Sequence, residues 1–178
     1  MSILKVARLG HPVLRAPARS IEVSELMNET TQRLIDDMLE TMREYQGIGL
    51  AAPQVHVGIR LFVAGVDDPD GGMPPVVMVN PEIMPIGDLT EDDWEGCLSI
   101  PDIRGMVPRR AEIRVRSLDR HGREHTMTAS GYAARVIQHE TDHLDGVLFL
   151  DRMTSLETLT YLSEFERHGD VSNGANDS

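Results

Sequence analysis

The chain has 178 residues, a length that favours one domain with a single hydrophobic core. Its net charge of −12 argues against a general or specific DNA-binding protein, because duplex binding depends on cationic side chains. No apolar run approaches the roughly 20 residues of a membrane-spanning helix, and residues 1–10 lack the apolar core of a secretory signal. We therefore expect a cytoplasmic protein without membrane contact.

The first predicted element is an amphipathic helix over Ser24–Tyr45, with Ser24 as its N-cap. Gly47 and Gly49 are expected to end this helix. Its apolar residues recur at three- and four-residue spacings: Met27, Leu34, Met38, Leu39 and Met42. That spacing places them on one helix face, which we expect to pack against the core.

Short strands are predicted after this helix. The apolar runs Arg60–Val66 and Val76–Asn80 read as buried strands, separated by the turn region Asp67–Pro75. Farther along the chain, Glu112–Leu118 and Arg123–Met127 flank a turn and predict a β-hairpin.

A local basic stretch overlaps this hairpin, although the chain as a whole is acidic. It comprises Arg104, Arg109, Arg110, Arg114, Arg116, Arg120 and Arg123. Arg114 and Arg116 alternate with Ile113 and Val115, a pattern typical of a strand with one solvent-exposed face. We therefore expect these two arginines to face solvent.

The C-terminal third predicts two more helices. The first runs over Ser130–Asp145 and ends at Gly146, and the apolar run Val147–Leu150 predicts a strand after it. The next helix is expected from Thr154, where Glu157 completes a capping-box pattern. Its apolar stripe comprises Leu156, Leu159, Leu162 and Phe165.

Helices separated by a group of strands predict a single α+β domain with mostly antiparallel β-sheet. We expect this domain to span residues 1–168. Residues 169–178 are polar, and we expect them to form a flexible tail.

The strongest local motif is HExxH at His139–His143, inside the predicted helix. Positions i and i+4 of a helix lie on one face, so His139 and His143 can reach the same metal ion. Glu140 would then lie beside a metal-bound water molecule. The competing interpretation is that both histidines are hydrogen-bonded on a solvated helix face.

A catalytic metal site needs three protein ligands and one open position. Downstream of the motif the remaining histidine is His168, which lies near the predicted tail. The alternative is Cys97, the only cysteine, in the segment Glu95–Ser99. A lone cysteine can also be a small buried hydrophobic residue, and both interpretations stay open on spacing alone.

Three motifs in this order resemble those of the peptide deformylase family. They are Gly47-Ile48-Gly49-Leu50-Ala51-Ala52-Pro53-Gln54, Glu95-Gly96-Cys97-Leu98-Ser99 and Gln138-His139-Glu140-Thr141-Asp142-His143. The resemblance also covers residues 11–15 and continues to about Asp151. It implies a sheet packed around a central HExxH helix, with a further helix at the C-terminus.

The resemblance implies a role for each of several residues. Cys97, His139 and His143 would bind the metal, and Glu140 would be the general acid and base. The side-chain amide of Gln54 and the backbone N–H of Leu98 would stabilise the oxygen that becomes negative in the reaction. Four residues would bind the substrate: Ile48, Gly49, Gly96 and Arg104.

The implied reaction is hydrolysis of the formyl group of N-formylmethionine on nascent polypeptides by a metal-bound hydroxide, with release of formate. The cofactor would be one divalent metal ion, ferrous iron, with Zn²⁺, Ni²⁺ or Co²⁺ as alternatives. Transient contact with the ribosome is part of the same resemblance, but the segment Ser155–Ser178 is acidic and disfavours docking on RNA. An HExxH endopeptidase and a non-catalytic metal- or peptide-binding protein are the competing hypotheses.

Overall fold

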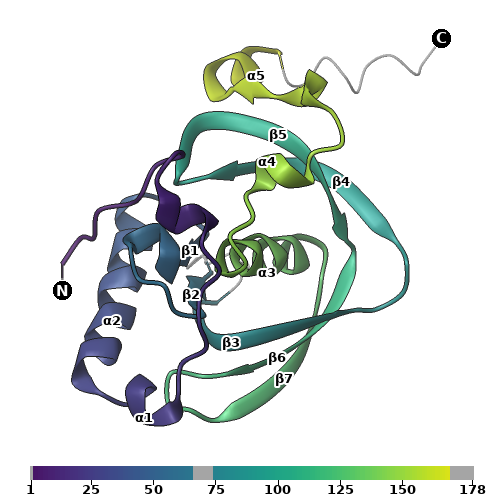
Figure 1. The fold of residues 1–178 in the computed structure, drawn as a ribbon. Helices are drawn as coiled ribbons and strands as arrows, with labels where there is room; N and C mark the ends of the chain where they lie inside the picture. Colours follow the sequence, from purple (N-terminus) through teal and green to yellow (C-terminus); the bar gives the residue numbers. More distant parts are fainter. Residues whose placement is uncertain (1, 66–73, 169–178) are drawn as a thin grey trace.

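The structure is a computed structural model that describes residues 2–65 and 74–168. The predicted tail 169–178 lies outside the described residues, as does most of the predicted turn region Asp67–Pro75. Figure 1 shows a central helix, α3, between two β-sheets, with a long helix, α2, on one side of the molecule.

The first predicted helix is divided in two. Helix α1 spans Val23–Leu26 and α2 spans Glu29–Glu44. Asn28 lies between them in an extended conformation, and its side chain accepts a hydrogen bond from Thr31 N at 2.9 Å. The prediction of Ser24 as the N-cap was therefore wrong, because Asn28 starts the long helix anew. The face of α2 that meets the core is apolar as predicted, with Ile35, Met38 and Met42 buried.

The larger sheet has five antiparallel strands in the order β1-β2-β3-β6-β7. They span Gly49–Ala51, Leu61–Ala64, Val76–Pro85, Glu112–Leu118 and Glu124–Ser130. Both predicted strands and the predicted hairpin are confirmed. Strand β3 runs beyond its predicted end because a register shift between Val79 and Glu82 accommodates Pro81, with Asn80 at a φ of 48°.

The smaller sheet consists of β4, β5 and β8, which span Thr90–Cys97, Ile100–Arg110 and Thr160–Tyr161. Sequence patterns did not predict β4 or β5. The first half of β4 is solvent-exposed and acidic, and β5 contains Pro101 and Pro108, so neither strand shows a clear alternation of apolar residues. Two residues, Leu98 and Ser99, join the two strands at their closed end.

Helix α3 spans Gly131–Leu144 and confirms the predicted HExxH helix. Ser130 is its N-cap residue, and Gly146, two residues past the helix, has a φ of 73°. The helix contacts strands of both sheets, and ten of its residues are buried. Antiparallel sheet around a central helix is the predicted architecture, and it places the HExxH residues inside the protein.

The C-terminal part differs from the prediction. Residues Phe149–Arg152 form a short helix, α4, where a strand was expected, because the Asp151 carboxylate accepts from Leu148 N at 2.8 Å and caps the turn. The predicted last helix begins later than expected. A short 3₁₀ helix at Leu156–Thr158 and strand β8 precede α5, which spans Leu162–His168.

Two further 3₁₀ helices, Pro12–Arg15 and Ala52–Val55, complete the described elements. Within residues 2–65 and 74–168, no helix combines the length and the apolar character that crossing a membrane requires.

Candidate metal centre and active site

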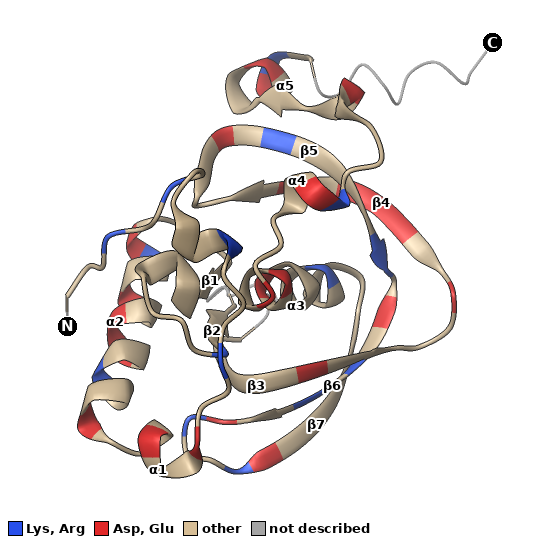
Figure 2. Ribbon diagram, viewed as in Figure 1, with Lys and Arg blue, Asp and Glu red and all other residues tan. Residues whose placement is uncertain are grey.

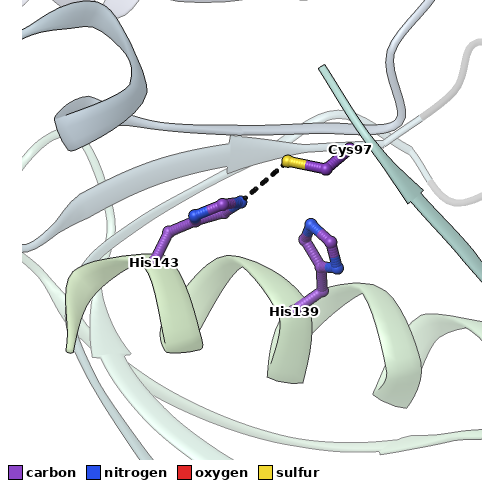
Figure 3. Close-up of side chains that lie close together, drawn as sticks. All are labelled: Cys97, His139 and His143. Atoms are coloured by element: carbon purple, nitrogen blue, oxygen red, sulfur yellow. Dashed lines mark hydrogen bonds between the residues drawn. The ribbon is translucent and has the colours of Figure 1, made fainter. Parts of the chain in front are cut away.

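Three side chains from two elements meet at the centre of the protein. Cys97 ends strand β4, and His139 and His143 occupy successive turns of α3 (Figure 3). One potential ligand atom from each residue lies within 4.8 Å of the other two, and Cys97 Sγ lies 3.2 Å from His143 Nε2. The structure thus brings together the three residues that the sequence suggested as metal ligands. His168 lies on the exposed helix α5, outside this group.

The chemistry of this group fits a divalent transition metal. One thiolate and two imidazoles are ligands that iron, zinc, nickel and cobalt accept, and three protein ligands leave a position open. Burial opposes ionisation of the Cys97 thiol, but the adjacent His143 and His139 outweigh it, so the pKa of Cys97 lies well below its ordinary value. A thiolate is the form that binds metal.

Glu140 lies directly beside this group. Burial raises the pKa of its carboxyl to about 7, a value suited to a group that gains and loses a proton near neutral pH. Its Oε2 atom is buried and has no hydrogen-bond partner among the described residues. Such an atom is available to a substrate or a water molecule in the site.

Glycine at position 49 allows Glu140 to approach the strand β1. A Cβ atom added to Gly49 would lie 2.7 Å from Glu140 Cγ and even closer to the carboxyl group. We expect Gly49→Ala to displace Glu140. The turnover number, kcat, of the reaction catalysed at this site should then fall roughly 10- to 100-fold, since a displacement of about 1 Å can cost that much. Steady-state kinetics would measure this, with Gly58→Ala as the control, because a Cβ at Gly58 meets no atom within 4 Å. Equal kcat values in the two variants would contradict this requirement for glycine.

Gln54 is buried beside Cys97 and Ser99. Its Oε1 accepts from Ala51 N at 2.8 Å, which fixes the direction of the amide. Its Nε2 is 3.4 Å from Cys97 Sγ and 3.2 Å from Ser99 Oγ, so the amide N–H group points to the site. Leu98 follows Cys97 in the chain and lines the cavity that opens onto these residues.

A cavity of about 390 Å³ opens onto these residues. All four residues predicted to bind substrate line it: Ile48, Gly49, Gly96 and Arg104. The guanidinium of Arg104 lies across Gly96, where an added Cβ would be 2.8 Å from Arg104 Nε. Glycine at 96 therefore makes room for the arginine.

Sequence reasoning missed the carboxylate that orients His139. Glu95 Oε2 lies 2.8 Å from His139 Nδ1, which leaves His139 Nε2 for the metal. Burial opposes ionisation of Glu95, but the hydrogen bonds from His139 and Arg109 outweigh it and lower its pKa to about 2. Glu95 is therefore a charged acceptor for the imidazole N–H group.

Two buried arginines hold Glu95 in place. Arg109 donates to both of its carboxylate oxygens, at 2.8 and 3.0 Å, and to Asp142 at 2.5 Å. Arg135 donates to Glu95 at 2.9 Å and to the backbone carbonyl of Val107 at 2.7 Å. Arg109 belongs to the basic stretch, and its burial could not be inferred from a run of arginines. Arg114 and Arg116 of the same stretch are exposed, as predicted.

The fold and this site define a class of protein, a metallohydrolase whose two histidines and one cysteine lie beside a glutamate. Comparisons with known proteins identify the family. A family model described as Polypeptide deformylase matches residues 3–159. The peptide deformylase of Leptospira biflexa is 40% identical over 95% of this chain and 98% of that protein. Peptide deformylase 2 of a Nostoc species is 45% identical over 89% of this chain and 90% of that protein.

Solved structures agree with this result. The peptide deformylase of Thermotoga maritima has a TM-score of 0.79 and 41% identity, covering 87% of this chain and all of that one. The chain belongs to the polypeptide deformylase family, whose members are metallohydrolases that act on formylated nascent peptides. The family predicted from the three motifs is thereby confirmed.

Proposed function

We propose that this chain removes the formyl group from N-formylmethionine with one divalent metal held by Cys97, His139 and His143. The observation that carries this proposal is the convergence of these three ligand atoms beside a buried, partner-free oxygen of Glu140. When bound, the metal supplies Lewis acidity that activates a water molecule near neutral pH. Ferrous iron is the proposed native metal, and Zn²⁺, Ni²⁺ or Co²⁺ can occupy a site with these ligands.

Glu140 is the proposed general acid and base. Its buried carboxyl, with an Oε2 atom that has no partner among the described residues, can take a proton from the attacking water and give one to the departing amine. Gln54, with an amide fixed by Ala51, and the backbone N–H of Leu98 are the proposed donors to the developing negative oxygen.

The peptide is proposed to lie along the cavity, with its backbone against Ile48 and Gly49 and with Gly96 and Arg104 on the facing side. A solved peptide deformylase of Acinetobacter baumannii, 38% identical with a TM-score of 0.81 over 86% of this chain and all of that one, is described as bound to Met-Ala-Ser. That tripeptide starts with the residue that deformylation exposes, which supports a peptide in this cavity.

We further propose that residues 1–168 form the catalytic domain, that 169–178 are a flexible tail, and that the protein acts in the cytoplasm on chains emerging from the ribosome. The acidic side chains of α5, Glu164 and Glu166, disfavour docking on RNA through this helix. Ribosome contact through it is therefore expected to be weak.

The direct test is formate release from a short formyl-Met peptide by protein loaded with ferrous iron or nickel without oxygen. We expect release that is lost after removal of the metal with a chelator and restored when the metal is returned. Cleavage of an unformylated peptide at an internal bond, without formate, would instead establish the endopeptidase. Metal and peptide binding without either reaction would establish a binding protein.

A further inference from the structure

The C-terminal segment 160–168, which contains β8 and α5, forms part of the wall of the active-site cavity. Leu162, the first residue of α5, is half-buried and lines the cavity together with Trp94 and Arg104. Among the described residues it is the one lining residue that follows Glu140 in the chain. The family model matches residues 3–159, so this segment begins where the match ends.

The same segment supports an irregular part of β5. In the β4–β5 pair, Cys97 lies opposite Ile100 and Glu95 lies opposite Gly105, so residues 101–104 bulge out opposite a single residue of β4. Asp102, within this bulge, has a φ of 61°. Three members of the bulge line the cavity: Pro101, Asp102 and Arg104.

Strand β8 pairs with this bulge. Ile103 is opposite Tyr161 and Arg104 is opposite Thr160, so backbone pairing fixes a stretch of chain that β4 leaves unpaired. The hydroxyl of Thr158 accepts from Met106 N at 3.1 Å and extends this connection. The position of Arg104 in the cavity thus depends on the C-terminal segment.

Helix α5 also packs against β4. The rings of Trp94 and Phe165 have centroids 4.7 Å apart with an angle of 55° between their planes. Figure 1 shows α5 above β5, at the end of the molecule away from the large sheet. Acidic residues lie along β4 in Figure 2, but the side chains that join α5 to the cavity wall, Leu162 and Phe165, are apolar.

We propose that Leu162 is a specificity-determining residue that contacts an apolar side chain of the peptide beyond its formylmethionine, on a wall that β8 and Phe165 hold in place. The proposal rests on the proposed function, because the formyl group must lie between Cys97 and Glu140 to react. Val136 and His139 of α3 line the cavity beside that point. Leu162 lines the cavity from the segment that pairs with the bulge, and we place the portion of the peptide that follows formylmethionine against it.

The first experiment compares kcat and KM of Leu162→Ala for formyl-Met-Ala-Ser and formyl-Met-Leu-Ser. We expect KM for the leucine peptide to rise roughly tenfold, kcat to stay within about twofold, and the alanine peptide to be much less affected. Leu162→Met should restore the wild-type preference, since it keeps an apolar side chain of similar volume. Leu156→Ala is the matched control, because Leu156 is 69% exposed and does not line the cavity.

The second experiment uses fluorescence and needs no catalysis. Trp94 is the chain's one tryptophan, so all tryptophan emission reports on this wall. We expect emission to shift when unformylated Met-Leu-Ser binds, and Phe165→Ala to shift it to the red in the free protein and weaken peptide binding. A Leu162→Ala variant with wild-type KM for both peptides, or emission unchanged by a saturating peptide, would overturn the proposal. Absence of formate release by the wild type would instead overturn the proposed function. The fluorescence titration would then still show whether a peptide binds against the cavity wall at Trp94.

Discussion

The Glu140→Gln variant is expected to keep its metal and to lose roughly a thousandfold in kcat for formate release, as general acid–base groups contribute about 10²- to 10⁴-fold. Glutamine has nearly the same shape, so the neighbouring His139 and His143 should still bind metal. It cannot take up or release a proton at the required step. The measurement is steady-state formate release together with metal content per chain.

The control for this variant is Glu157→Gln, an exposed glutamate outside the cavity, which should leave both quantities unchanged. A Glu140→Gln protein that retains full metal and at least a tenth of wild-type kcat would show that another group carries the proton. Loss of metal in this variant would show that Glu140 mainly supports the ligands.

The Cys97→Ala variant is expected to lose metal and activity together. Changing a residue that only supports a metal ligand typically weakens metal affinity 10- to 100-fold, so loss of a direct ligand should exceed roughly 100-fold. Equilibrium dialysis against Zn²⁺ or Ni²⁺ measures the affinity. Since Cys97 is the only cysteine, a thiol reagent provides a second readout, because bound metal should slow its labelling in the wild type.

His168→Ala is the matched control, because His168 is the histidine that an endopeptidase with a downstream ligand would use. It lies on α5 and is 72% exposed in its side chain, so we expect no change in metal affinity. Retention of metal by Cys97→Ala with loss by His168→Ala would contradict the proposed ligand set.

The part of the fold that could be predicted from sequence is the part with regular patterns. Helix α3 has a cap residue, a glycine past its end and an apolar periodicity, and the HExxH spacing on one helix face already places His139 near His143. Local rules determine all of these features. The motifs also singled out Cys97, which the fold then brings to the same point.

The ion pairs of Glu95 with Arg109 and Arg135 could not be predicted in this way. Glu95 and Arg109 are 14 residues apart, and Glu95 and Arg135 are 40 residues apart. Their meeting depends on the register of β4 against β5 and on the position of α3 across both strands. A charged residue in a sequence pattern indicates solvent exposure unless its partners are known, and here the partners come from other elements.

The C-terminal errors have a similar cause. The stripe of Leu156, Leu159, Leu162 and Phe165 has helical spacing, but Thr160 and Tyr161, which lie between its members, pair with the bulge of β5 instead. Tertiary pairing outweighed the local preference. The break at Asn28 has a different cause, because it depends on a local hydrogen bond in which the Asn28 side chain accepts from Thr31 N and begins α2.

The three proposed ligands divide between elements that otherwise belong to separate layers, with Cys97 on the small sheet and the two histidines on the central helix. A metal ion bound here is a cross-link between distant parts of a chain that has one cysteine and so forms no internal disulfide. Because metal binds the folded chain and not the separated elements, its binding free energy adds to the stability of the folded state, by about 2.7 kcal/mol at a hundred times Kd. We therefore expect removal of the metal to lower the free energy of unfolding as well as the activity of the protein.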